Sequence, residues 1–296
     1  MNDRDYGRIP TERPHAGSRD LDRLSPSRLF DLMNAQDAAV VRAVRRAKRG
    51  VLRAVDIVVD RLSRGGRLYL VGAGTSGRLC VLEAAECPPT FNTPPRQIQA
   101  VMAGGRSSVF RSREGAEDDP APVRRLFDRV LTPRDAVVAV AASGVTAHAR
   151  AALAAARRKK AAAVFLTGNP GARPPADARV VFATGPEILT GSTRLKAGTA
   201  TKMILNMLTT MSMVRLGKVH GQWMVDLQPR SRKLAARGRR LIVDLGGATP
   251  ARAAALLRQA GGRTKTAILM AGRSVSRSVA EKRLKAAGGR LREAMR

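Results

Sequence analysis

Residues 68–82 read LYLVGAGTSGRLCVL, and this stretch decides the fold. An apolar run of strand length ends at Gly72, the glycines Gly74 and Gly77 follow, and a helix-forming segment continues without a break. A strand, a glycine turn and a helix in this order aim backbone N–H groups and the positive end of the helix dipole at one point. The stretch therefore predicts a turn that holds an anion, and a phosphate fits it.

This turn also fits the G-x-G-x-x-G pattern of dinucleotide-binding folds, but the rest of that fingerprint is missing. The acidic residue that binds the ribose should follow about 20 residues later, where this chain has Asn92 and Thr93. A Walker A loop needs Gly-Lys-Ser or Gly-Lys-Thr, and here Gly77 is followed by Arg78. Both nucleotide motifs therefore fail, and we expect no cofactor.

Short apolar runs alternate with helical segments through the middle of the chain. This alternation is typical of a parallel sheet with helices on both faces. We therefore expect an α/β fold with a doubly wound five-stranded parallel sheet, in a domain that extends from residue 58 to residue 221. The expected strands are residues 68–71, 98–102, 136–141, 162–166 and 180–183.

Residues 1–57 precede this domain and should form a polar arm and N-terminal helices. Residues 1–24 are rich in arginine and proline, so we expect an arm that lies on the body of the protein or on a partner. Ser25 should cap a helix that ends near Leu32, and Asp37 should begin a longer one.

The C-terminal part of the chain should be mostly helical. Ser192 or Thr193 should cap a long helix that ends near Leu216, and its methionines should fill the core. Residues 222–296 should form a small C-terminal helical appendage, with three short helices from about Thr249 onward. Glycine pairs should separate these helices, namely Gly246-Gly247, Gly261-Gly262 and Gly288-Gly289.

The chain carries 54 lysines and arginines against 23 acidic residues, so its formal net charge is +31. Such a charge attracts polyanions at low salt, and basic runs lie at residues 45–53, 157–160 and 230–240. Aromatic residues make up only 3% of the chain, however, and no helix-turn-helix, zinc-finger or RNA-recognition pattern is present. We therefore expect nonspecific attraction and no specific nucleic-acid partner.

Nothing in the sequence indicates a membrane segment, because no stretch approaches the roughly 20 apolar residues that span a bilayer. Residues 1–13 are charged and lack the apolar centre of a signal peptide, so we expect a cytoplasmic protein. Cys80 and Cys87 should lie on one helix face, too far apart for a disulfide, as reduced thiols. No metal is expected, because the histidines are scattered at His15, His148 and His220.

A second turn of small residues, AASGVT at residues 141–146, also follows an apolar run and precedes a helix. In open parallel sheets ligands bind just outside the carboxyl ends of the strands, so the two turns should face the same space. Each hydroxyl alone fits a helix cap, but two such turns in one sheet favour a shared phosphate site. The residues expected to bind the phosphate, or the edge of its sugar, are Gly74, Thr75, Ser76, Ser143, Gly144 and Thr146.

Four motifs follow one another along the chain: GAGTSGRL at residues 72–79, AECPPTF at 85–91, EGAEDD at 114–119 and TGSTRLKAGTA at 190–200. The pair of turns resembles the sugar isomerase domain, whose fold binds phosphosugars. The four motifs in this order resemble the N-acetylmuramic acid 6-phosphate etherases, and the resemblance runs from about Leu21 to the C-terminal helices.

The resemblance implies a homodimeric enzyme that converts N-acetylmuramic acid 6-phosphate to N-acetylglucosamine 6-phosphate and D-lactate during cell-wall sugar recycling. In the ring-opened sugar the C1 aldehyde acidifies the C2 proton, so a base can remove it while an acid protonates the ether oxygen at C3. The family's two catalytic glutamates fall on Glu86 in AECPP and on Glu117 in GAEDD. We assign Glu86 as the acid and Glu117 as the base; either carboxyl can serve either way, since its environment sets its pKa.

The fourth motif is expected to contribute Ser192, Thr193 and Lys196 to the substrate site. Three interpretations are open: capping of the long helix, a wall of the ligand site, or a subunit contact. Arg194 and Lys196 lie in the expected first turn of the helix, where cations oppose the dipole, so they indicate an anionic neighbour. The substrate's lactyl carboxylate and an acid of a partner subunit are the candidates.

The chain departs from the family pattern at several positions that flank the expected site. Cys80 and Asn92 stand where glycine is usual, Val145 stands where arginine is usual, and residues 228–231 differ from the usual Ala-Thr-Asn. These departures bear on substrate fit and turnover. Two alternatives are a phosphosugar-binding regulator similar to the glucokinase regulatory protein and a phosphosugar isomerase; the presence of both glutamates favours the etherase.

Overall fold

The computed structural model describes residues 7–229 and 231–296. In this part of the chain, no helix is long and apolar enough to cross a membrane. The chain divides into two compact units, each built from two stretches of sequence. The first unit comprises the chain up to Ala84 together with Arg96–Thr209, and the second comprises Ala85–Pro95 together with Thr210–Arg296.

A five-stranded parallel sheet lies in the first unit, with the strand order β2-β1-β3-β4-β5. The predicted doubly wound α/β fold is therefore confirmed. The strand order reverses direction between β1 and β3, and such a switch point places a crevice at the carboxyl ends of these two strands. The strands are β1 (Leu68–Gly72), β2 (Ile98–Met102), β3 (Ala136–Val140), β4 (Ala162–Thr167) and β5 (Ala178–Val181).

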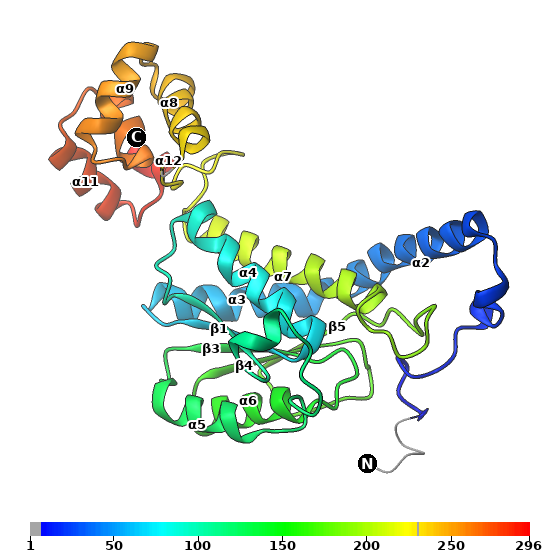
Figure 1. The fold of residues 1–296 in the computed structure, drawn as a ribbon. Helices are drawn as coiled ribbons and strands as arrows, with labels where there is room; N and C mark the ends of the chain where they lie inside the picture. The colour runs from blue at the N-terminus through cyan, green and yellow to red at the C-terminus, as the bar shows by residue number, and fades with distance from the viewer. Residues whose placement is uncertain (1–6, 230) are drawn as a thin grey trace. The chain divides into compact units, whose positions relative to one another are not determined.

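Helices cover both faces of this sheet (Figure 1). α5 (Ala121–Val130) and α6 (Ala147–Arg158) lie on one face, and α3 (Lys48–Ser63) lies on the other. Side chains alternate between the faces along each strand, and Tyr69 meets Phe127 of α5 edge to face, with 5.3 Å between the ring centroids. Every residue of β1, β3 and β4 is buried, which is why these strands appear in the sequence as continuous apolar runs.

The N-terminal helices differ from the expectation at one boundary. α2 runs over Pro26–Arg46, and Ser25 caps it as predicted, with its Oγ accepting from the backbone N–H of Arg28 at 3.4 Å. The predicted break before Asp37 is wrong, because this range contains no glycine, and proline only at its first position. The helix therefore continues to Ala47, where α3 follows directly.

Part of the N-terminal arm lies on the first unit, as predicted. Ile9 and Thr11 are buried, with 4% and 1% of their surface exposed, and the backbone N–H of Gly191 donates to the carbonyl oxygen of Thr11 at 3.2 Å. Two short 3₁₀ helices, Ala16–Ser18 and Leu21–Arg23, lead from there toward α2. The arm is thus fixed beside the turn that precedes α7.

The long helix α7 (Lys196–Arg215) begins later than predicted. Ser192 and Thr193 lie in the turns before it, so the prediction that one of them caps the helix is wrong. The cap is the fully buried side chain of Glu187, which accepts from the backbone N–H groups of the first two residues of α7 at 3.0 and 2.9 Å. A carboxylate suits this position because the first N–H groups of a helix are unpaired and carry the positive end of its dipole.

The second unit is a bundle of helices around its own apolar core. Its α10 is the most deeply placed, since residues 264–270 are all buried. The prediction of three helices from Thr249 onward is wrong, because four are present. The unpredicted break lies at Ser274, whose φ is 52°, and Ser276 caps the next helix. The helices are α8 (Arg232–Gly246), α9 (Pro250–Gln259), α10 (Thr264–Arg273), α11 (Arg277–Ala286) and α12 (Leu291–Ala294).

Candidate functional site

A pocket of about 350 Å³ opens at the carboxyl ends of β1 and β3, where the strand order predicts a crevice. None of the described residues that line it is a lysine or an arginine, although the chain has a net charge of +31. The described lining therefore offers N–H and O–H groups to an anion. Seven of the residues predicted from the sequence to form the site line the pocket: Gly74, Thr75, Ser76, Glu117, Ser143, Thr146 and Thr193.

The first turn is tight because two glycines approach each other backbone to backbone. A Cβ on Gly72 would lie 2.8 Å from the backbone nitrogen of Gly77, and one on Gly77 would lie 2.7 Å from the carbonyl oxygen of Gly72. Gly74, with φ of 52°, begins α4 (Gly74–Phe91). The first N–H groups of a helix have no partner within it, and here the residues that carry them line the pocket. The turn therefore has the geometry of an anion site.

The second turn presents two hydroxyl groups to the same pocket. Ser143 Oγ accepts from the backbone N–H of Val145 at 3.4 Å, which leaves the serine proton for a ligand. Thr146 precedes α6, but its side chain makes no capping hydrogen bond, so the capping interpretation does not hold for this residue. Gly144 has φ of 82°, and a Cβ there would lie 2.4 Å from the Cβ of Ala172. Glycine is therefore required between the two hydroxyls.

Glu117 lies in the loop between β2 and α5 and lines the pocket. Its carbonyl oxygen accepts from the backbone N–H of His148 at 3.0 Å, so the start of α6 holds this loop. Partial burial of the carboxyl group, and then the charges of Asp118, Glu114 and Glu12, raise the pKa of Glu117. The side chain remains exposed at the rim, so solvent moderates the shift. A raised pKa suits a carboxyl that transfers protons near neutral pH.

Four predicted site residues do not line this pocket, and Glu86 is the most important of them. Glu86 is an exposed residue of α4 that belongs to the second unit. Two prolines, Pro88 and Pro89, follow it inside the helix. The pairing of Glu86 with Glu117 therefore stays a prediction. The other three residues are Gly144, Ser192 and Lys196.

Lys196 is buried among polar residues of the same chain. Its ammonium donates to Oε1 of Gln36 at 2.9 Å. Burial lowers the pKa of Lys196, while Glu187 and Asp37 oppose that shift. The anion at the first turn of α7 is thus Glu187 of the same chain, a neighbour that the sequence did not single out.

Two residues of the N-terminal arm, Ile9 and Glu12, line the pocket although they were not predicted to do so. An irregular arm that contacts a distant turn leaves no periodic pattern in the sequence. The local sign that could have found it is Ile9, an isolated large apolar residue in a polar segment, since such a residue needs a surface to pack against.

Cys80 and Cys87 are both buried. Burial, with a further effect from Glu83, strongly raises the pKa of the Cys80 thiol. This thiol stays protonated and packs as a small apolar group. Among residues 7–229 and 231–296, no three histidine, cysteine or acidic side chains gather in the manner of a metal site.

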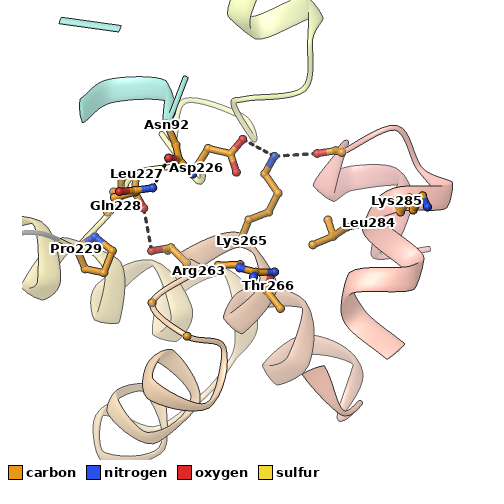
Figure 2. A pocket seen from close by; sticks show the side chains of 14 residues that line it. Asn92, Asp226, Leu227, Gln228, Pro229, Arg263, Lys265, Thr266, Leu284 and Lys285 are labelled. Carbon is orange, nitrogen blue, oxygen red and sulfur yellow. Dashed lines mark hydrogen bonds and ion pairs between the residues drawn. The ribbon is translucent and has the colours of Figure 1, made fainter. Parts of the chain in front are cut away.

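A second pocket, of about 620 Å³, lies within the second unit (Figure 2). The ammonium of Lys265 donates to the carbonyl oxygens of Gly217 and Gly289 and to the carboxylate of Asp226, at 2.9, 2.8 and 2.9 Å. An ammonium has three donors, so this group is fully used within the protein. Burial, opposed by Asp226, lowers the pKa of Lys265. We therefore interpret this cluster as a structural strut.

Two of the departures from the family pattern, Asn92 and Gln228, meet at this second pocket. The side-chain amide of Gln228 donates to Oδ1 of Asn92 (Figure 2). Asn92 has φ of 53°, in the left-handed region that favours glycine and tolerates asparagine, which explains why glycine is usual there. Neither residue lines the pocket at β1 and β3, whereas Val145 does.

Known proteins resemble this chain over its whole length. The N-acetylmuramic acid 6-phosphate etherase of Synechocystis is 45% identical over 98% of this chain and 96% of its own length. The protein of the same name from Geobacillus thermodenitrificans is 44% identical over 97% and 98%. Residues 50–159 match the family described as glucokinase regulatory protein N-terminal SIS domain. A phosphoheptose isomerase structure from Francisella tularensis is 14% identical, with a TM-score of 0.47, over 62% of this chain and 98% of that one.

The two full-length matches agree with the order of the four motifs in the sequence. They cover the arm, the sheet and the helical bundle, so they do not depend on the glycine turn alone. The chain therefore belongs to the N-acetylmuramic acid 6-phosphate etherase family.

Proposed function

We propose that this protein cleaves the D-lactyl ether of N-acetylmuramic acid 6-phosphate and releases D-lactate and N-acetylglucosamine 6-phosphate. The observation that carries the proposal is the pocket at β1 and β3, which both small-residue turns and Glu117 line. The pocket occurs in a chain that is 45% identical to a named etherase over nearly its whole length.

The phosphate is assigned to the two turns. Ser76, Ser143 and Thr146 offer hydroxyl protons, and the start of α4 offers backbone N–H groups. A phosphate dianion only accepts hydrogen bonds, so a cluster of free donors suits it. With the phosphate held there, the rest of the sugar occupies the same pocket as Glu117.

The reaction needs one proton removed and one supplied. Glu117 takes the C2 proton, and the electrons of that bond form a double bond between C2 and C3. The bond between C3 and the lactyl oxygen breaks as Glu86 gives this oxygen a proton, and D-lactate leaves. Water then adds its oxygen to C3 and gives a proton to Glu86, while Glu117 returns its proton to C2. The raised pKa of Glu117 supports such a role in proton transfer.

A homodimer is part of the proposal, and α2 offers a surface for it. Phe30, Met33 and Val41 are 67%, 37% and 56% exposed, and their spacing places them along one side of the helix. A stripe of exposed apolar side chains is typical of a surface that contacts another protein. Sedimentation of the wild type as a dimer and of Phe30→Asp as a monomer would support this, whereas a monomeric wild type would contradict it.

A second candidate function is phosphosugar binding without turnover. It is favoured by the match of residues 50–159 to the SIS domain described for the glucokinase regulatory protein. Such a regulator would use the two turns in the same way but would not need Glu86 or Glu117.

One assay separates the candidates. The purified chain is incubated with N-acetylmuramic acid 6-phosphate, and D-lactate is measured with D-lactate dehydrogenase. Release of D-lactate together with N-acetylglucosamine 6-phosphate supports the etherase. Binding of the sugar phosphate with no D-lactate indicates the regulator. A separate incubation with an aldose phosphate that has a C2 hydroxyl tests the isomerase, which would convert it to a ketose phosphate.

A further inference from the structure

The N-terminal arm is anchored at the wall of the pocket at β1 and β3. Ile9 and Thr11 are almost fully buried, and the backbone N–H of Glu12 donates to the carbonyl oxygen of Ile9 at 2.9 Å. Thr11 accepts a hydrogen bond from the backbone of Gly191, in the turn whose Thr193 also lines the pocket. These contacts fix the main chain on both sides of the Glu12 side chain.

The carboxylate of Glu12 is half-buried and keeps acceptor positions for a ligand. One oxygen accepts from the hydroxyl of Thr11 at 2.9 Å. The other lies near the backbone of Gly191, where a Cβ would come within 3.1 Å of it. A carboxylate has about four acceptor positions, so most of them are not used by these neighbours.

Glu12 stands among other acidic residues of the pocket. The pocket already contains Glu117 and Asp118, and like charges that share a site disfavour one another. Within residues 7–229 and 231–296, no lysine or arginine forms an ion pair with Glu12, although the chain has 54 of these residues. Because the side chain lines the pocket and keeps unused acceptor positions, it is available to a ligand that donates hydrogen bonds.

We propose that Glu12 is a substrate-binding residue that accepts a hydrogen bond from an O–H or N–H group of the sugar. A carboxylate repels a phosphate, whereas sugar hydroxyls and an acetamido N–H are donors that it binds. In this arrangement the turns at β1 and β3 bind the phosphate, and Glu12 of the arm contacts the sugar. This assignment rests on the proposed function for the identity of the sugar and adds a residue that selects it.

Calorimetric titration of the full chain with three ligands tests the proposal: N-acetylglucosamine 6-phosphate, glucose 6-phosphate and inorganic phosphate. Glu12→Ala should weaken binding of the amino sugar phosphate by about tenfold or more, the worth of a charged hydrogen bond, and leave inorganic phosphate within about twofold. Glu12→Gln keeps a carbonyl acceptor, so its affinity for the amino sugar phosphate should fall less than that of Glu12→Ala. If only the affinity for N-acetylglucosamine 6-phosphate falls, the hydrogen bond to Glu12 comes from the acetamido N–H group. If the affinity for glucose 6-phosphate falls as well, the hydrogen bond comes from a sugar hydroxyl.

Two further variants separate the carboxylate from the arm that carries it. Asp20→Ala removes another acid of the same arm, which is exposed and makes no capping hydrogen bond, and should bind all three ligands like the wild type. Thr11→Val removes the hydroxyl that bonds Glu12 but keeps the carboxylate, so it should retain most of the binding.

Three results would overturn the proposal. Glu12→Ala could bind both sugar phosphates as tightly as the wild type. Its affinity for inorganic phosphate could fall as much as its affinity for the sugar phosphates. Thr11→Val could lose as much affinity for the sugar phosphates as Glu12→Ala. The last two would show that the arm only supports the pocket. Because the titrations need no turnover, a wild type that binds these sugars but releases no D-lactate from N-acetylmuramic acid 6-phosphate refutes the etherase and still gives a result for Glu12.

Discussion

The backbone N–H of His148 donates to the carbonyl oxygen of Glu117 at 3.0 Å, and through this bond the first turn of α6 fixes the loop that carries the proposed base. The imidazole of His148 is buried, and neither ring nitrogen has a hydrogen-bond partner in the described structure. The second turn, which leads into α6, and the loop that carries Glu117 are therefore joined by a main-chain hydrogen bond at the edge of the pocket.

The buried imidazole should make stability depend on pH. Burial lowers the pKa of His148, although the charge of Asp119 opposes the shift. The unfolded chain takes up this proton near pH 6.5, so the folded state loses stability as the pH falls through that value. His148→Phe should remove the pH dependence that comes from this imidazole. The unfolding temperature of the variant should therefore fall less than that of the wild type between about pH 7.5 and about pH 5.5. An equal fall in both proteins would contradict the prediction.

The two glutamates should affect turnover and not folding. Glu117→Gln and Glu86→Gln should each lower kcat by about 10²- to 10⁴-fold, the usual contribution of general acid–base catalysis. Inorganic phosphate binding and the unfolding temperature should stay near the wild-type values. Glu114→Gln is the matched control on the same loop, because Glu114 does not line the pocket, and it should change kcat far less. Near-normal turnover by either site variant would refute that residue's role.

The second turn should not tolerate a side chain at Gly144. Gly144→Ala combines a φ of 82° with a contact of 2.4 Å to Ala172, so it should lower the free energy of unfolding by about 1–3 kcal/mol and weaken phosphate binding. Gly185→Ala is the control, because Gly185 has φ of 72° but open space around it. Urea unfolding and phosphate titration measure both effects. Equal results for the two variants would show that the contact with Ala172 does not matter.

The strut at Lys265 should matter for stability. Lys265→Met removes one of the two ammonium groups beside Asp226 and leaves two carbonyl groups without this donor, so it should lower the free energy of unfolding by about 3 kcal/mol. Lys218, whose ammonium lies 3.2 Å from the same carboxylate, is more exposed, and Lys218→Met should cost less. Chemical denaturation followed by circular dichroism compares them. A larger loss from Lys218→Met would contradict the assignment.

Much of the first unit could be predicted from the sequence, for a physical reason. Strands buried on both faces must be apolar throughout, so β1, β3 and β4 stand out against the polar helices around them. The glycines at the ends of β1 and β3 mark places where backbone touches backbone or where φ is positive, and other residues do not fit there. Both turns of the pocket can therefore be recognised from the order of residues alone.

The features that were missed depend on contacts between distant parts of the chain. The cap of α7 comes from Glu187, outside the local window in which serine and threonine caps are sought. The breaks at Ala47 and Ser274 fall at residues that are compatible with helix. Glu12 reaches the pocket through an arm of irregular structure. The helix cap and the two helix breaks cannot be predicted from spacing or composition, and the only local sign of the arm's contact is the isolated apolar residue Ile9.

A pocket that no described lysine or arginine lines, in a chain of net charge +31, separates two tasks that one cation could have done together. The surface charge acts over distance and raises the rate at which an anionic ligand arrives. The short bonds from hydroxyl and backbone groups decide how long that ligand stays. Added salt should accordingly slow capture in a stopped-flow experiment and leave the residence time almost unchanged, so that the charge governs arrival and the turns govern departure.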